Sequence, residues 1–295
     1  GCDSGTSGIS QYIIRLIECF AGIAGSDDIE VMTYEDEKDI FVTHPGELPV
    51  VTAGATLRSP VRDILWHQFS IPGLCRARDY DVLFLPAANR RVPFRLPCPM
   101  VGTVHEFSWL HMTGKYDRAR RVYLTRVLPR LINRLDHVIT VSECSKRDIL
   151  AHTRQTDDNV SVIHNGVDHD IFFPRDTDDA RKEVAGAFGV SEPFILYISR
   201  LEHPGKNHVR LIRAFEKVKN TTHIPHKLVL VGGDYLGADV VHQAADASPN
   251  RRDIVFTGFA PTDSLPVLYA AADIFAFPSL YEGFGIPFVE AMASG

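Results

Sequence analysis

Short apolar runs alternate with longer amphipathic stretches along this chain. Runs at 81–86, 137–141, 194–198 and 227–231 are rich in Val, Ile, Leu and Phe, and each stops at a proline, serine or glycine. Stretches with apolar residues at helical spacing lie between these runs. This alternation predicts parallel sheets whose strands are joined by crossover helices.

The expected elements form two consecutive series. Strands are expected at 29–34, 81–86, 99–104, 137–141, 160–163, 194–198, 227–231, 254–256 and 273–277. Helices are expected at 9–24, 59–78 with an interruption near Pro72, 118–134, 207–218 and 264–271, with others beginning after Ser142 and near Pro287. Ser59 and Ser142 are the expected N-caps of two of these helices, and Ser145 is the alternative to Ser142.

A break in the pattern separates the two series. The stretch 168–181 is acidic, contains Pro174 and lacks apolar periodicity, which is typical of a linker. At 295 residues, the chain has room for two domains of roughly 100–200 residues each. We therefore expect an α/β protein with a Rossmann-like domain at 1–170, a linker at 171–185 and a second, incomplete Rossmann-like domain at 186–295.

The two ends of the sequence point to a longer protein. The chain starts in a polar Gly/Ser stretch at 1–8, without a signal-peptide pattern, and stops at Gly295, where a helix would be capped. We expect a first strand before this sequence and closing helices after it.

Composition argues against several classes of protein. The chain is 45% hydrophobic and 23% charged, which is ordinary for a soluble globular protein, and no apolar run approaches the roughly 20 residues of a membrane-spanning helix. The net charge of −6, without a dominant Lys/Arg run, argues against an extended nucleic-acid interface. The five cysteines form no C-x-x-C pair, so we expect free thiols in a reducing, cytoplasmic compartment and no zinc site.

The stretch 278–290 is the first candidate site. Glu282 lies in a loop after an expected strand, and Glu290 lies in the helix that follows. Ligands of open α/β sheets bind outside the carboxyl ends of strands, and the N-terminus of a helix favours a phosphate. Two carboxylates there suit sugar and ribose hydroxyls. The alternative is an ordinary loop with one exposed Glu and one Glu favoured by the helix dipole, and the spacing alone does not decide.

The stretch 199–207 is the second candidate site, and it also follows a strand. Arg200 and Lys206 flank a Pro-Gly turn, so both cations could face the same end of the sheet and stabilise a departing diphosphate without a metal. Solvated surface cations are the alternative. The neighbouring Glu282 loop favours the functional interpretation.

Three other features are weaker signals. The loop Ser4–Gly8 enters a helix and could hold an anion, although a disordered terminus is an alternative. His105 sits at a strand end, where it could bond a sugar hydroxyl or transfer a proton. Asn165-Gly166 is interpreted first as a turn.

The expected helix at 118–134 and the residues just before it are strongly basic. The cations are Lys115, Arg118, Arg120, Arg121, Arg126, Arg130 and Arg134. A solvated helix face is one interpretation. The other is a patch for anionic lipid or a lipid-diphosphate acceptor.

Five segments in this order resemble glycosyltransferase family 4, whose members have the GT-B fold of two Rossmann-like domains facing across a cleft. They are Thr103-Val-His105, Thr140-Val-Ser-Glu-Cys-Ser-Lys146, Val162-Ile-His-Asn-Gly-Val-Asp168, Ser199-Arg200 through Lys206-Asn207, and Glu282-x7-Glu290. The resemblance runs from residue 5 to 295.

The resemblance implies roles for particular residues. Arg200 and Lys206 would bind and stabilise the donor diphosphate, Glu282 would bind the transferred sugar, and His105 would lie at the sugar and acceptor; these four are the implied catalytic residues. The implied donor-binding residues are Gly8, Gly258, Phe259, Phe284, Gly285, Ile286 and Glu290. Family members retain anomeric configuration and generally need no metal or other cofactor, which agrees with the lack of a metal-ligand cluster or clear nucleophile in the sequence.

The expected function is therefore that of a retaining hexosyltransferase, class EC 2.4. It would move a hexose, with mannose as the guess, from a GDP- or UDP-sugar to a saccharide or lipid-linked acceptor in bacterial surface-polysaccharide or lipopolysaccharide synthesis. The expected location is the cytoplasm, with peripheral contact at the inner face of an anionic membrane. The alternatives are a nucleotide-sugar 2-epimerase of the same fold, which the Glu282 and Glu290 pair argues against, and a non-catalytic GT-B subunit. A Rossmann dehydrogenase is disfavoured because no G-x-G-x-x-G follows a strand.

Overall fold

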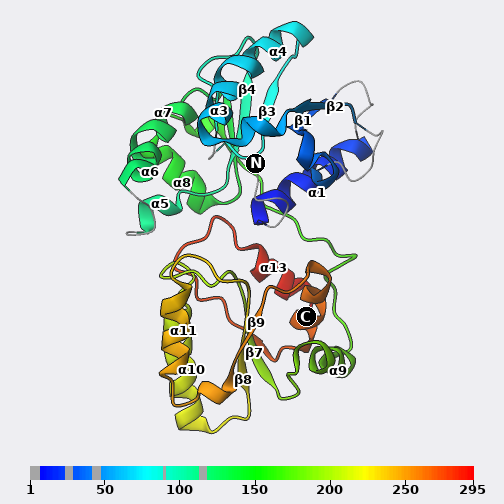
Figure 1. Cartoon of the computed structure of the whole chain (residues 1–295), viewed down its shortest axis with the longest axis vertical. Helices are drawn as coiled ribbons and strands as arrows, with labels where there is room; N and C mark the ends of the chain where they lie inside the picture. The colour runs from blue at the N-terminus through cyan, green and yellow to red at the C-terminus, as the bar shows by residue number, and fades with distance from the viewer. Residues whose placement is uncertain (1–6, 24–28, 42–47, 89–90, 113–117) are drawn as a thin grey trace. The chain divides into compact units, whose positions relative to one another are not determined.

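The computed structural model describes residues 7–23, 29–41, 48–88, 91–112 and 118–295. The chain forms two compact units (Figure 1), which we describe separately. The first unit comprises Gly1–Phe107 and Arg118–Asn165, and the second comprises Ser108–Asp117 and Gly166–Gly295. The fold predicted from the strand and helix alternation is confirmed in both units, because every strand pairing described is parallel.

The first unit is built on a four-stranded parallel sheet in the order β3-β4-β5-β6. Its strands are β3 (Leu83–Leu85), β4 (Met100–Val104), β5 (His137–Thr140) and β6 (Val160–Val162). Two further strands, β1 (Val31–Tyr34) and β2 (Val50–Ala53), pair with each other in a separate parallel sheet. The short strand β2 was not expected from the sequence.

The helices of the first unit connect these strands. They are α1 (Gly8–Ile23), α2 (Lys38–Phe41), α3 (Pro60–Leu65), α4 (Ile71–Arg78), α6 (Arg118–Val122), α7 (Leu128–Ile132) and α8 (Glu143–His152). Ser142 caps α8, since its Oγ accepts the backbone N–H of Ser145 at 3.1 Å. Ser145 instead donates its hydroxyl to the carbonyl of His105 at 3.0 Å, so the choice left open by the sequence falls on Ser142.

The expected interruption near Pro72 is a change of helix type and not a break in the helix. The chain stays helical across the stretch, through a π-helical segment at Trp66–Ser70 that leads directly into α4. Pro72 lies in the first turn of α4, where its missing N–H costs little. The same arrangement occurs before Pro129, where a π-helical segment at Tyr123–Val127 leads into α7.

The second unit has a four-stranded parallel sheet in the order β10-β7-β8-β9. Its strands are β7 (Phe194–Ile198), β8 (Lys227–Val231), β9 (Ile254–Gly258) and β10 (Ile274–Phe275). The chain passes from β7 to β8 and β9 on one side of β7, and then returns to place β10 on the other side. The direction of strand order therefore reverses between β7 and β10, and this is the switch point at which open α/β sheets bind ligands.

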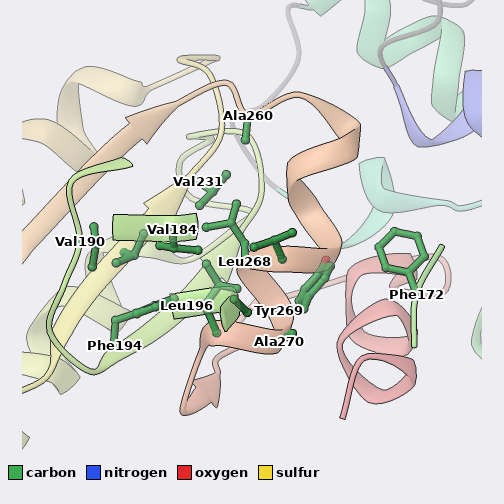
Figure 2. Packing of buried hydrophobic residues seen from close by; sticks show 14 residues of the cluster. Phe172, Val184, Val190, Phe194, Leu196, Val231, Ala260, Leu268, Tyr269 and Ala270 are labelled. Atoms are coloured by element: carbon green, nitrogen blue, oxygen red, sulfur yellow. The ribbon is translucent and has the colours of Figure 1, made fainter. Parts of the chain in front are cut away.

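Helices cover both faces of this sheet. They are α9 (Thr177–Phe188), α10 (His208–Thr222), α11 (Ala238–Asp246), α12 (Leu265–Ala271) and α13 (Ile286–Ala293). Leu196 and Val231 pack with residues of α9 and α12 on one face (Figure 2). Tyr197 and Leu230 pack with residues of α10 and α11 on the other. Because successive side chains of a strand point to opposite faces, burial of both faces explains why these strands are continuous apolar runs.

The predicted linker at 171–185 is wrong. Helix α9 begins at Thr177, and Ala180 and Val184 are buried in the core of the second unit. Their four-residue spacing places both on one face of the helix, but the five acidic or basic residues of α9 hid the pattern in the sequence. The compact unit also begins earlier than expected, at Gly166, and includes the short helix α5 (Ser108–His111). Neither α5 nor α11 was expected.

The capping residue of α9 provides a test of whether this stretch is helical. The Asp176 carboxylate accepts the backbone N–H of Asp179 at 3.0 Å, so Asp176→Ala should lower the free energy of unfolding by about 1 kcal/mol. Asp178→Ala is the matched control, because it removes an exposed carboxylate from the same turn without removing the cap. Chemical unfolding curves of both variants would measure the difference. Equal effects of the two substitutions would contradict the capped helix.

Candidate functional site

Two loops emerge at the switch point of the second unit. The β7 loop (199–207) joins β7 to α10, and the β10 loop (276–285) joins β10 to α13. Both follow the carboxyl ends of adjacent strands, since β7 and β10 pair directly. The sequence prediction that the two candidate stretches lie at one edge of a sheet is confirmed.

Two hydrogen bonds, one of them between backbone groups, join the two loops. The N–H of Leu280 donates to the carbonyl of Gly205 at 3.0 Å. The side-chain amide of Asn207 donates to the carbonyl of Pro278 at 2.9 Å. Neither loop can therefore shift without disturbing the other.

A buried tyrosine ties both loops to the sheet beneath them. The Tyr197 hydroxyl donates to the carbonyl of Lys206 at 2.8 Å and lies 3.0 Å from the Ser279 hydroxyl. Burial raises the pKa of Tyr197 to about 12, so the hydroxyl keeps its proton and remains a donor. Strand β7 thus supplies both the start of its own loop and an anchor for the two loops.

An ion pair forms across the two loops. Lys206 Nζ lies 2.7 Å from Glu282 Oε1, and the two side chains are 21% and 22% exposed. Each group therefore remains accessible to a ligand while being partly withdrawn from water. The arrangement can offer a cation to an anionic group and a carboxylate to hydroxyl groups at the same point.

Arg200 also lies on the β7 loop, six residues before Lys206. Its guanidinium carbon is 4.2 Å from the ring centroid of Tyr235, and its side chain is 51% exposed. An exposed guanidinium has donors in a planar fork that suits phosphate oxygens.

Gly232, directly after β8, allows the β7 loop to approach closely, and Gly258 is the last residue of β9. Gly232 has a φ of 148°, and a Cβ added there would lie 2.1 Å from the carbonyl oxygen of Ser199. Its N–H donates to the carbonyl of Gly258 at 2.9 Å. Gly258 has a φ of 70°, and the following Phe259 is 67% exposed, so its ring is accessible to a ligand.

Helix α13 starts directly after the β10 loop. Gly285 precedes its first residue, Ile286, with a φ of 95°, and a Cβ there would lie 3.1 Å from the ring of Phe277. Phe284 and Ile286 are half-buried beside it. Helix α13 thus begins at the end of the loop that carries Glu282. In its first turn Pro287 has no N–H, and Phe288 donates its N–H to the carbonyl of Gly285 at 3.0 Å.

Glu290 lies on α13 and bonds back to the core. It accepts the Tyr269 hydroxyl at 2.9 Å. Burial raises the pKa of Glu290, and the hydrogen bond from Tyr269 opposes this rise. The structure thus places Glu290 on the same helix that begins at the β10 loop, but its carboxylate is already engaged by a protein donor.

His105 lies in the first unit, at the carboxyl end of β4. It is 7% exposed, and its Nε2 lies 2.8 Å from the carbonyl of Pro86. A carbonyl can only accept, so Nε2 carries a proton and donates it to Pro86. This engagement was not visible in the sequence, and it leaves Nε2 committed to the backbone.

The start of α1 lies near His105. Tyr12, one turn after Gly8, packs edge-on against the His105 ring with centroids 4.8 Å apart. Ser7 caps the helix, since its Oγ accepts the N–H of Ser10 at 3.3 Å, so Gly8 is a helical residue. The rest of the predicted Ser4–Gly8 anion loop lies outside the described residues.

The described residues contain neither a metal-ligand cluster nor a membrane-spanning helix. No group of three or more His, Cys, Asp or Glu within those residues could hold a metal ion. The described helices include none that is long and apolar enough to cross a membrane. The expectation that no metal is required stays a prediction.

Comparison with known proteins identifies the family. Residues 6–171 match the family described as Glycosyltransferase Family 4, and residues 178–295 match the family described as Glycosyl transferases group 1. The chain belongs to glycosyltransferase family 4.

Curated relatives of this family 4 chain include two enzymes of O-antigen synthesis. It is 28% identical over 218 residues to O-antigen chain mannosyltransferase B of Escherichia coli, covering 74% of this chain and 56% of the relative. It is 26% identical to O-antigen chain mannosyltransferase RfbU of Salmonella typhimurium, covering 99% of this chain and 77% of the relative. The chain spans about half of the length of the first two curated relatives it matches.

Solved structures agree on the fold. The family 4 chain resembles Anabaena HepE in complex with UDP-glucose, with a TM-score of 0.73 and 20% identity over 99% of this chain and 76% of that one. It resembles sucrose-phosphate synthase from Thermosynechococcus elongatus with a TM-score of 0.73 and 18% identity, covering 98% and 74%. The predicted GT-B class, with two Rossmann-like parallel-sheet units, is confirmed.

The raised pKa of Glu290 gives the family 4 chain a pH-dependent stability. A carboxyl group with a raised pKa binds its proton more tightly in the folded state, so stability falls as pH rises from the ordinary 4.5 through the folded pKa. Glu290→Gln cannot ionise, so its free energy of unfolding should gain on that of the wild type across this window and keep the gain above it. Chemical unfolding at a series of pH values would measure the difference.

Tyr269→Phe is the companion variant. It removes the donor that opposes the rise, so the pKa of Glu290 should rise further and the window should widen. A stability difference between wild type and Glu290→Gln that is constant with pH would contradict the shift.

Proposed function

We propose that this chain is a retaining glycosyltransferase that moves a hexose from a nucleotide sugar to a saccharide or lipid-linked acceptor. The observation that carries the proposal is the ion pair of Lys206 and Glu282 at the switch point, 2.7 Å apart. A sugar diphosphate needs a cation for its phosphates and an acceptor for its sugar hydroxyls, and these two side chains offer both at one place.

The chemistry follows from the charges of the site. Arg200 and Lys206 would bind the diphosphate and stabilise the negative charge that develops as it leaves. Glu282 would accept hydrogen bonds from the sugar, and the backbone N–H groups of Phe284 and Gly285 would donate to the same sugar. Glu290 would accept the ribose hydroxyls once Tyr269 shares or yields its bond. The departing phosphate oxygen would take the acceptor proton, so no protein nucleophile is required.

The curated relatives and the solved structures point to different sugar donors. Mannose is supported by the two O-antigen mannosyltransferase relatives, whereas the structure of HepE holds UDP-glucose. We infer mannosyl transfer in surface-polysaccharide synthesis from the curated relatives. The epimerase and non-catalytic alternatives gain no support from them.

Thermal shift and transfer assays would test the proposal. One of the UDP-, GDP-, ADP- or dTDP-sugars at 100-fold its Kd should add about 2.7 kcal/mol of stability, and product analysis should show transfer with retained configuration. Lys206→Ala should lower kcat by about 10²- to 10³-fold, as expected for loss of a charge that stabilises the transition state. Lys182→Ala is the control, because Lys182 is an exposed cation of the same unit that pairs with Asp179. Absence of binding to every nucleotide sugar would contradict the proposal.

We also propose peripheral contact of the first unit with anionic membranes. Exposed arginines follow one another along α6, α7 and the π-helical segment between them, at Arg118, Arg121, Arg126 and Arg130. Val122 among them is 50% exposed. Each basic residue near an anionic surface contributes about 1 kcal/mol. The predicted Lys115 lies outside the described residues, and the side chain of Arg120 is likewise not described.

Vesicle sedimentation would test the membrane contact. Arg126→Glu combined with Arg130→Glu should reduce binding to phosphatidylserine vesicles by more than tenfold, while neutral phosphatidylcholine vesicles should bind neither protein. The control carries Arg210→Glu and Arg213→Glu, which change the net charge equally on exposed positions of α10. Equal loss in both double variants would show a general charge effect and contradict a specific patch.

A further inference from the structure

The segment after β8 continues to pair with the β7 loop beyond the ends of the two strands. Ser199 donates its N–H to Val231 at 2.9 Å, Leu201 donates to Gly233 at 3.0 Å, and Tyr235 donates to Leu201 at 3.1 Å. This run of bonds extends the parallel ladder of β7 and β8 into their loops. The position of Tyr235 relative to the β7 loop is therefore fixed by backbone bonds.

This extended ladder places an aromatic ring against Arg200. The guanidinium carbon lies 4.2 Å from the Tyr235 ring centroid, within the range of a cation–π interaction. Both side chains are about half exposed, at 51% and 45%. The ring can therefore restrict the guanidinium while solvent still reaches it.

A buried carboxylate lies on the same loop as Arg200. Glu202 is 2% exposed, and its Oε2 is 3.5 Å from an Nη of Arg200. A buried carboxylate is costly unless an opposite charge or hydrogen bonds compensate it. Glu202 can thus fix Arg200 from the protein interior, whereas a solvated partner could not.

The loop is shaped to keep this carboxylate in place. A Cβ added at Gly205 would lie 2.9 Å from Glu202 Oε1 and 2.8 Å from Met112 Sδ. Any side chain at position 205 would therefore displace Glu202 or Met112. The Pro-Gly turn of the β7 loop makes room for Glu202 as well as presenting Lys206.

We propose that Glu202 and Tyr235 are positioning residues that hold the Arg200 guanidinium ready for the diphosphate of a nucleotide. The inference rests on the proposed function and deepens it. Ordering a long side chain before binding lowers the entropy lost when the ligand arrives. The planar fork of arginine gains most from this, because two parallel hydrogen bonds to phosphate require one orientation.

The sign of one substitution separates positioning from simple electrostatics. Glu202→Gln removes a negative charge near the proposed diphosphate site. Electrostatics alone would then tighten binding of an anion. Positioning predicts the reverse, because Arg200 loses the carboxylate that orients it.

Calorimetry with GDP, UDP and the corresponding nucleosides would test the proposal. Glu202→Gln should weaken binding of the nucleoside diphosphate that the wild type prefers by about tenfold and leave nucleoside binding unchanged. Tyr235→Leu should weaken diphosphate binding by about two- to fivefold, the size of an exposed cation–π interaction. Tyr235→Phe keeps the ring and should bind as the wild type does.

Two controls test whether the effect passes through Arg200. In an Arg200→Ala background, Glu202→Gln should cause no further loss of diphosphate affinity. Asp234→Asn removes an exposed charge from the same ladder, where Asp234 pairs with His242. It reports the pure charge effect and should not weaken diphosphate binding. Circular dichroism of each variant checks folding, and the Tyr235 pair decides the matter if Glu202→Gln does not fold.

The outcomes distinguish this inference from the proposed function. A wild type that binds no nucleoside diphosphate overturns both. A wild type that binds, with Glu202→Gln and Tyr235→Leu equal to it or tighter, overturns only the positioning roles. Equal losses for the nucleoside and the diphosphate would show a general structural role and would also overturn them.

Discussion

The pairing of β7 with a strand on each side is the constraint on which the second unit depends. β10 lies along one edge of β7 and β8 along the other, so the β7 loop has a neighbouring loop on both sides. It is bonded to the β10 loop through Leu280 and Gly205, and to the segment after β8 through Leu201 and Tyr235. A loop held from both sides has few conformations to lose when a ligand binds. The backbone positions that carry its cations are therefore defined before any ligand is present, which favours electrostatic stabilisation under the proposed function.

Much of this site could be predicted from sequence because it depends on strand ends. Arg200 is separated by one residue from an apolar run and Glu282 lies in the loop after another, and parallel strands bring their carboxyl ends to one edge. The fold followed from the same alternation. Helix α9 was missed because its charged residues outnumber its two buried residues. A single sequence does not show which face of a helix is covered. The engagement of His105 with the Pro86 carbonyl is a tertiary contact without any trace in spacing.

Glu202 and Tyr235 were missed for a different reason. Both lie within or beside stretches that the sequence had singled out, but neither residue type is unusual there. Their importance comes from burial and from the extended ladder, since Glu202 is almost completely buried and Tyr235 is brought beside Arg200 by backbone bonds. In the sequence, only the nearby glycines indicated that these loops pack closely. Gly205 and Gly232 each lie where a Cβ would collide with a neighbour, and such glycines mark close approach.

The two cations of the β7 loop differ in what a ligand must do to them. Arg200 is stacked and exposed, so a phosphate can reach it without breaking a short ion pair. Lys206 is a compact charge held 2.7 Å from Glu282, so a phosphate must compete with that carboxylate. Under the proposed function, drawing Lys206 toward the phosphate would release Glu282 to accept the sugar hydroxyls. A free nucleoside diphosphate would bind Lys206 without using the Glu282 carboxylate, whereas a sugar donor would bind both side chains. Under that function the ion pair would favour the complete donor over its leaving group, because only the donor supplies new partners to both Lys206 and Glu282.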